Sequence, residues 1–148
     1  MFFEEQMTKI LETKDTKQLS LDFIAGLITS QGYFNWINQN KGCQKVPVFQ
    51  LKMSVDNKNL IFAVRNTLRL KEPIYEYKQK KSQFVLLLVR KKESIKKIII
   101  PAFDNRLQGR KQKQFDQWKE KFFQEEKKWQ YRHLEKIKGP KIMDVEKL

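Results

Sequence analysis

The sequence has very little of the chemistry that builds thiol, redox or zinc sites. It contains one cysteine, Cys43, and one histidine, His133, in 148 residues. A single thiol cannot form an internal disulfide, and one Cys with one His cannot supply the three or four ligands of a zinc site. A Cys–His nucleophilic pair would need an oriented third group. We therefore interpret His133 as a solvated side chain on a basic helix.

Long apolar runs and acidic residues are also scarce. The longest apolar segment, residues 84–89, has the length of a strand and is too short to span a membrane. The 31 Lys and Arg residues exceed the 17 Asp and Glu residues, which gives a formal charge of +14. This excess indicates a polyanionic partner, and nucleic acid is favoured over a membrane surface. The length fits one compact domain with a sizeable core.

The N-terminus resembles no targeting sequence. Residues 1–5 lack the basic start and apolar core of a signal peptide, and they lack the Arg-rich character of a transit peptide. We expect either that the chain works where it is made or that a leader has been removed. The sequence is rich in Lys, Asn, Ile and Phe, as is common for A+T-rich organelle genomes, which favours a mitochondrion or plastid as its location.

Hydrophobic periodicity predicts an α+β chain. Residues 1–19 form a polar arm with a short helical pattern at Met7, Ile10 and Leu11. A helix follows over 21–31, capped by Ser20 or Asp22 and ended by Gly32. Two-residue alternation then predicts four strands, over residues 33–40, 46–55, 73–79 and 83–90. Helical spacing predicts three more helices, over residues 58–70, over 93–100 until Pro101 stops it, and over 112–138 as one helix or a pair.

The first of these helices carries the most specific signal. Ile24 to Gly32 resembles the nine-residue motif that names the LAGLIDADG homing endonucleases. Residues 98–104 resemble the family's segment of Ile or Leu followed by Pro and Phe. Residues 110–118 resemble its stretch in which a basic residue precedes two aromatic residues. The resemblance covers about residues 20–123, with a single copy of the motif.

This resemblance implies the fold and the domain organisation. The family fold is an αββαββα saddle of antiparallel strands backed by helices. We expect an arm over 1–19, a LAGLIDADG-like domain over 20–123, and a basic C-terminal helical extension and tail over 124–148. Single-motif members act as homodimers whose motif helices pack through small residues. The corresponding helix-interface residues in this sequence are Ala25, Gly26 and Ser30.

One motif position departs from the family. The eighth residue, an acid that holds the catalytic divalent metal in family members, is Gln31 here. Mg²⁺ prefers hard oxygen ligands and carboxylate charge, and an amide supplies a neutral oxygen. Asp22 lies about 13 Å away along the same helix, and no other acid precedes Asp56. We therefore expect no intact catalytic site and no cofactor, with Mg²⁺ only in an active endonuclease.

Lys111 is a possible remnant of the active site. When the chain is aligned on Phe115 and Trp118, Lys111 falls where the family keeps an active-site lysine. It either contacts phosphate or is one more solvated lysine.

The candidate nucleic-acid contacts come from the strand faces, because the concave sheet face of the family lies in the DNA major groove. Such residues can contact base edges, stack on unpaired bases or bind phosphate. Any single lysine can equally be a solvated surface charge. The predicted set is Tyr33, Asn35, Gln39, Gln50, Lys52, Ser54, Tyr75, Tyr77, Lys78, Lys80, Lys81 and Lys111.

The C-terminal segment has two interpretations. Residues 119–138 mix both signs of charge, which is typical of a solvated helix with intrahelical ion pairs. Trp129 and Tyr131 instead favour docking on a partner protein or on RNA.

Together these features predict a catalytically inactive LAGLIDADG-fold nucleic-acid-binding protein. We expect structured RNA as its partner, within a ribonucleoprotein assembly, as an organellar ribosomal component or an intron maturase. One alternative is an active homodimeric metal-dependent homing endonuclease that cuts a long near-palindromic DNA site. Another is a protein-bound structural subunit whose charge serves solubility.

Overall fold

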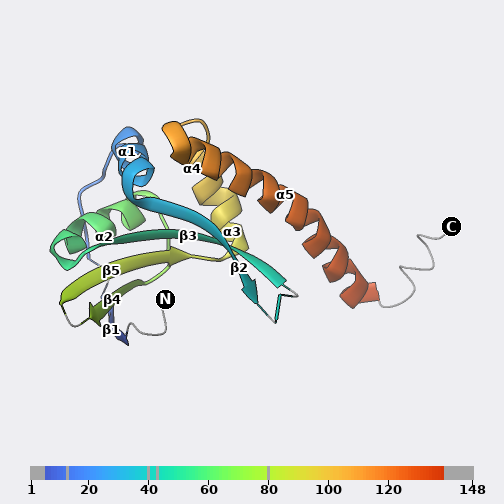
Figure 1. Ribbon diagram of the computed structural model, residues 1–148, viewed down its shortest axis with the longest axis horizontal. Helices are drawn as coiled ribbons and strands as arrows, with labels where there is room; N and C mark the ends of the chain where they lie inside the picture. Colours follow the sequence, from blue (N-terminus) through green and yellow to red (C-terminus); the bar gives the residue numbers. More distant parts are fainter. Residues whose placement is uncertain (1–5, 13, 40, 43, 80, 139–148) are drawn as a thin grey trace.

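A five-stranded antiparallel sheet with helices against one face forms the centre of the molecule (Figure 1). The computed structural model describes residues 6–12, 14–39, 41–42, 44–79 and 81–138. Neighbouring strands follow the order β1-β4-β5-β3-β2, which confirms the predicted α+β class. The elements are β1 (Gln6–Leu11), α1 (Leu21–Gln31), β2 (Gly32–Gln39), β3 (Gln44–Ser54), the 3₁₀ turn η2 (Val55–Asn57), α2 (Lys58–Thr67), β4 (Ile74–Gln79), β5 (Ser82–Val89), α3 (Lys92–Ser94), the π-helical η3 (Ile95–Ile99), α4 (Ile100–Phe103) and α5 (Gly109–Lys138).

The N-terminal arm differs from its prediction. Its apolar pattern predicted a short helix, but Gln6–Leu11 is a strand that pairs antiparallel with β4, with an irregularity between Met7 and Lys9. The prediction was wrong because three apolar residues in so short a stretch do not fix a period. The free edge of β4 offers a row of backbone hydrogen-bonding groups, and pairing with it decides the conformation.

The core lies between the helices and one face of the sheet. Phe34 on β2 sits at its centre, with ring centroids of four aromatic residues 5.0–6.3 Å away. These residues come from β3, from α4 and from α5, so one side chain joins three elements that are distant in sequence. The four are Phe49, Phe103, Phe115 and Trp118.

The helix that begins at Lys92 was expected to stop at Pro101, and that expectation was wrong. It continues through α4 to Phe103. The preceding residues 95–99 are π-helical, and Ile100 N donates to Ile95 O. Proline has no N–H to donate and its ring crowds the preceding turn. The wider π turn accommodates it without ending the helix. All other predicted elements are confirmed, with ends shifted by at most three residues.

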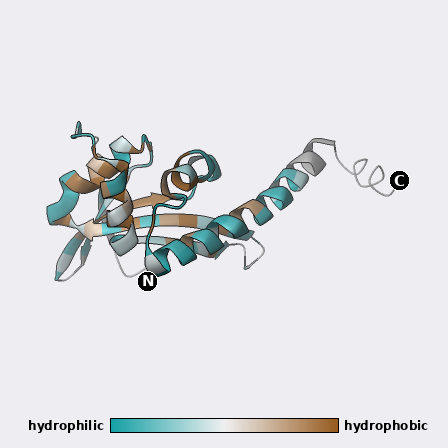
Figure 2. Ribbon diagram, turned by 90° about the horizontal axis from the view of Figure 1, so that it is seen from above, coloured by the Kyte–Doolittle hydropathy of each residue, from teal (hydrophilic) through white to brown (hydrophobic). Residues whose placement is uncertain are grey.

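Helix α5 is one continuous helix that runs past the edge of the sheet (Figures 1 and 2). Its far half is mostly hydrophilic (Figure 2). Trp129 nevertheless packs back onto the body, with ring centroids 5.4 Å from Phe122 and 6.4 Å from Trp36. Residues 124–138 therefore continue the helix that packs on the sheet. In the part of the chain that the structure describes, no helix is long and apolar enough to span a membrane.

Candidate nucleic-acid interface

One side of α1 is fixed to the core and the other is exposed. The hydroxyl of Ser20 accepts a hydrogen bond from Phe23 N at 3.1 Å, so Ser20, and not Asp22, caps the helix. Ile24 and Ile28 are fully buried. Ala25, predicted with Gly26 and Ser30 as a helix-interface residue, is also buried in this core, whereas Gly26 and Ser30 are exposed. Because of this, only Gly26 and Ser30 of the predicted set lie on the free side of the helix.

The C-terminal end of α1 turns directly into β2 at Gly32. Its φ of −76° is ordinary extended backbone, so no left-handed conformation requires glycine here. Glycine is required for steric reasons, because an added Cβ would lie 2.5 Å from Ile28 Cγ2 and 2.9 Å from Ile28 O. The tight turn places the exposed Gln31 at the end of the helix, beside the first residue of the sheet.

Lys111 reaches this same end from α5. Its Nζ donates to the carbonyl oxygen of Gly32 at 2.5 Å and to Oε1 of Gln114 at 3.2 Å. The Nζ also lies 5.9 Å from the ring centroid of Tyr33. Burial lowers the pKa of Lys111. The free carbonyls at a helix C-terminus attract a cation, and the lysine side chain supplies one.

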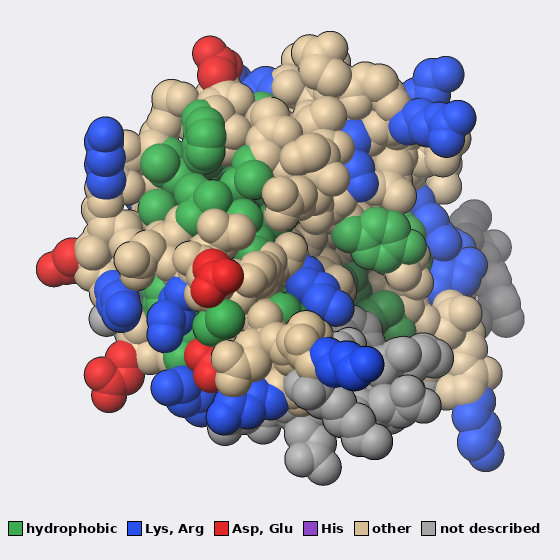
Figure 3. All heavy atoms as spheres, turned by 60° about the vertical axis from the view of Figure 1, so that its left-hand side comes forward, with side chains coloured by type: hydrophobic (Ala, Val, Ile, Leu, Met, Phe, Trp, Pro, Cys, Tyr) green, Lys and Arg blue, Asp and Glu red, His purple; other side chains and the backbone are tan. Residues whose placement is uncertain are grey.

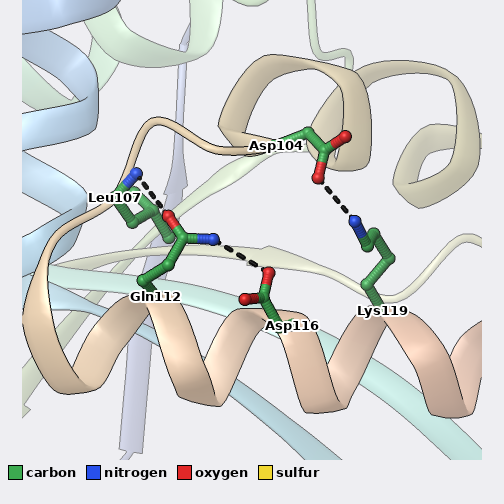
Figure 4. Close-up of polar contacts among 5 residues, drawn as sticks. All are labelled: Asp104, Leu107, Gln112, Asp116 and Lys119. Atoms are coloured by element: carbon green, nitrogen blue, oxygen red, sulfur yellow. Dashed lines mark hydrogen bonds and ion pairs between the residues drawn. The ribbon is translucent and has the colours of Figure 1, made fainter.

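The first turns of α5 are held by the loop that precedes them (Figure 4). Gln112 Oε1 accepts from Leu107 N at 2.9 Å, and its Nε2 donates to Asp116 at 2.8 Å. Lys119 pairs with Asp104 at 2.5 Å. These contacts fix the register of α5 and so direct Lys111 toward α1.

Buried aromatic residues hold the same part of α5 against the sheet. Phe115 and Trp118 are buried, and the indole N–H of Trp118 donates to Asn35 O at 2.8 Å. The segment that resembled the family's basic-aromatic stretch therefore positions Lys111.

The donor atoms at the end of α1 do not match a magnesium site. Gln31 offers a neutral amide oxygen, and the Gly32 carbonyl already accepts from an ammonium group. Mg²⁺ binding in proteins relies on carboxylates. Within the described residues, no group of three or more His, Cys, Asp or Glu side chains comes together.

Strand register brings most of the predicted contact residues onto the sheet face opposite the helices, here called the outer sheet face. Tyr33 and Gln50 are direct cross-strand partners, and Lys52 aligns through Leu86 of β5 with Tyr75 of β4. Ser54 aligns in the same way with Tyr77, through Phe84. The predicted residues on this face are Tyr33, Asn35, Gln39, Gln50, Lys52, Ser54, Tyr75 and Tyr77.

The remaining predicted residues lie elsewhere. Alternation along β4 puts Lys78 on the face of the buried Ile74. At the strand end Lys78 lines an open groove of about 620 Å³ with Ser54 and Lys81. Lys111 lies at the end of α1, and Lys80 lies outside the described residues.

Sequence reasoning missed the centre of the outer sheet face, which is apolar. Phe84, Leu86 and Leu88 on β5 point to this face, and Phe84 and Leu86 are only 5% and 1% exposed. Tyr77 stacks on Phe84 with a centroid separation of 5.0 Å, and Lys52 Nζ lies 3.9 Å from the same ring centroid. The signal was the unbroken apolar run 84–89, because a strand with one solvated face would alternate.

Basic side chains also lie on another face of the molecule. Figure 3 shows Lys and Arg spread over the face that it draws, around an exposed apolar patch. Polar and basic groups next to apolar surface suit a partner that offers both phosphates and bases.

The comparisons with known proteins agree with the fold and with the place of the motif. A family model described as LAGLIDADG endonuclease matches residues 24–122. The chain belongs to this family. Its single motif copy and single domain correspond to the single-motif type.

Solved homing endonucleases show the same fold. I-GzeII in complex with its DNA target matches with a TM-score of 0.69 at 22% identity, over 86% of this chain and 45% of that one. I-LtrWI bound to target DNA matches with 0.65 at 24% identity, over 73% and 38%. I-TnaI matches with 0.62 at 19% identity, over 75% and 76%. The chain thus spans less than half the length of the first two proteins, and no curated protein matches it.

Proposed function

We propose that this LAGLIDADG-family chain binds nucleic acid without cleaving it and that its partner is structured RNA. The observation that carries the proposal is the end of α1, where Gln31 stands at the position of the metal-binding acid and Lys111 donates to the adjacent Gly32 carbonyl. The protein would act by binding and positioning RNA, with no metal cofactor and no turnover.

The electrostatics of this end support the absence of metal chemistry. A divalent cation next to Gly32 O would meet the positive charge of Lys111 at close range, and Gln31 supplies no carboxylate to offset it. The same ammonium group remains suited to a phosphate oxygen, because charge-assisted hydrogen bonds to phosphate are short and strong. The altered site therefore favours binding over hydrolysis.

The outer sheet face supports RNA over duplex DNA. Tyr33 is 45% exposed, and Tyr75 is half-buried beside the apolar β5 residues. Bases in a duplex are stacked on one another, whereas unpaired RNA bases can stack on aromatic side chains. Lys52, exposed on the same face, can bind phosphate. The charge of +14 favours a polyanion of either kind.

These properties support our proposal of a ribonucleoprotein role. Within that role we propose an organellar ribosomal component or an intron maturase, located in a mitochondrion or plastid. Either function needs an RNA-holding surface and no cleavage step.

A charge-removal experiment tests this proposal. Lys52→Gln combined with Lys78→Gln should weaken binding of the RNA that co-purifies with the protein by about tenfold at moderate salt. Lys17→Gln combined with Lys113→Gln removes the same charge from exposed positions off the sheet and serves as the matched control. Equal affinity of this variant and the unaltered protein would remove the proposed role of Lys52 on the outer sheet face and of Lys78 at the end of β4.

A second candidate function is an active homodimeric homing endonuclease. Family membership and the retained Lys111 favour it, and the exposed Gly26 leaves room for the close approach of a second helix, since an added Cβ there meets nothing within 4 Å. Mg²⁺-dependent cleavage of a long near-palindromic DNA site by the unaltered dimer would establish it. Gly26→Phe would then abolish dimer formation in sedimentation without disturbing the fold of the protomer.

A further inference from the structure

A groove lies between the α3–η3 segment and α5, among the helices and apart from the outer sheet face. It has an open volume of about 590 Å³. Lys92, Lys96 and Lys97 line it from one side, and Phe122 and Trp129 line it from the other. We call it the α3–α5 groove. No part of the function proposed above uses it.

Two further depressions lie near the α3–α5 groove, and one of them adjoins it. One, of about 390 Å³, shares Glu93 and Lys97 with it, and the other, of about 440 Å³, lies around Tyr131 on the next turn of α5. Nine basic side chains line the three depressions, against three acidic ones. The depression around Tyr131 shares no lining residue with the groove, and the spacing of its residues along α5 puts it on another side of that helix.

Two of the three acidic residues that line these depressions are paired with lysines of the groove. Glu126 pairs with Lys96 at 2.6 Å, and Glu93 pairs with Lys97 at 3.1 Å. Within the part of the chain that the structure describes, the other basic residues that line the three depressions, except Lys128, form no ion pair. These residues are Arg69, Lys71, Lys91, Lys92, Lys127 and Arg132.

Trp129 gives the groove an aromatic wall. Its ring packs against Phe122 and Trp36, and Lys92 Nζ lies 4.0 Å from its centroid. Burial lowers the pKa of Lys92, and the nearby charge of Arg132 lowers it further. An anion between these two cations would relieve their repulsion. Lys92 is exposed, and among the described residues it forms no ion pair in addition to this ring contact, so it can move to a phosphate and uncover the ring.

We propose that the α3–α5 groove is a second RNA-binding surface, which takes a single-stranded segment with one base stacked on Trp129 and its phosphates on the surrounding lysines. Charge complementarity selects a polyanion, and the aromatic wall selects one with an accessible base. Base stacking on an aromatic side chain combined with phosphate contacts is the general mode of single-strand binding. The surface is independent of the outer sheet face, so one protein could hold two parts of an RNA.

The test uses the full chain and a fluorescein-labelled oligouridylate, which forms no base pairs, with binding followed by anisotropy. Lys92→Glu in the groove combined with Lys91→Glu in the adjoining depression should weaken binding about tenfold or more and flatten the dependence of log affinity on log salt by about 0.7 per lost phosphate contact. Lys17→Glu combined with Lys113→Glu changes the net charge equally at exposed positions outside the groove. Lys113 lies sixteen residues, about 24 Å, from Trp129 along α5. This control should stay within about twofold of the unaltered protein.

A second pair of variants isolates the aromatic wall. Trp129→Leu keeps apolar bulk and should lose about fivefold in affinity, whereas Trp129→Tyr keeps an aromatic face and should retain most of it. Thermal melting monitors the fold of both.

Two results would overturn the proposal. One is oligouridylate binding by the groove variant within about twofold of the unaltered protein. The other is an equal loss of affinity in the control variant, because that loss would show a non-specific effect of net charge. The Lys52→Gln and Lys78→Gln variant is measured with the co-purifying RNA and not with oligouridylate, so failure of the outer sheet face in its own test remains a separate result.

Discussion

The buried side of α1 keeps the contacts that fold the domain, whereas its C-terminal end lacks the acid of the family motif. Ile24 and Ile28 on the buried side are fully enclosed by the core, and Ser20 caps the start of the helix. At the other end Gln31 is exposed, and the Gly32 carbonyl accepts from Lys111. The parts of the motif that fold the domain are intact, while the part that would hold a metal has changed. We therefore expect folding and metal binding to be separable in this helix.

The largest expected effect concerns the buried side. Ile28→Ala should lower the free energy of unfolding by about 2–5 kcal/mol, because it leaves a cavity in a fully enclosed site. Chemical denaturation measures this loss. A change below about 1 kcal/mol would show that α1 is not held by the core as described.

The two glycines of the motif differ in the space around them. Gly32→Ala should destabilise the protein by about 1–3 kcal/mol, since the new Cβ would overlap Ile28. Gly26→Ala meets open space and should leave stability unchanged or raise it by up to about 1 kcal/mol through helix propensity. Thermal and chemical unfolding of the two variants side by side measure the difference. Equal destabilisation would contradict the close approach at Gly32.

Lys111 tests the other end of the helix. Lys111→Met removes the donor to Gly32 O and should cost about 1 kcal/mol of stability, the typical net value of one hydrogen bond. It should also weaken RNA binding about fivefold through the loss of one phosphate contact. Stability comes from denaturation and affinity from a filter-binding titration. Unchanged affinity would leave Lys111 a purely structural residue.

The smallest expected change comes from restoring the acid. Gln31→Glu should alter stability by less than about 1 kcal/mol, because the unfavourable helix-end charge is offset by Lys111. The variant's Tm should then rise with added Mg²⁺ through binding to the folded state, while the Tm of the unaltered protein stays constant. A rise of the same size in both proteins would mean that Gln31 does not prevent metal binding.

The sequence predicted the features that depend on local patterns. The motif helix and the four central strands follow from periodicity, and short-range chemistry reduced the helix cap to Ser20 or Asp22, of which Ser20 is the cap. Alignment on Phe115 and Trp118 assigned Lys111 to the active-site position of the family, and both aromatic residues are buried.

The features that depend on partners distant in sequence could not be predicted in this way. The first strand forms because β4 has a free edge, and Pro101 stays helical because of a π turn. Ala25 is buried although it resembles its small neighbours on the exposed side. The hydrogen bond from Lys111 to Gly32 joins residues 79 positions apart. Sequence periodicity contains no information about such contacts.

The central claim is that this protein, with Gln31 at the position of the metal-binding acid, binds RNA without cleaving it. The most direct measurement is to crosslink the protein in its native source, recover it by sedimentation and sequence the attached nucleic acid. We predict ribosomal or intron RNA that is lost on RNase treatment. A free dimer enriched for one DNA site would contradict the account.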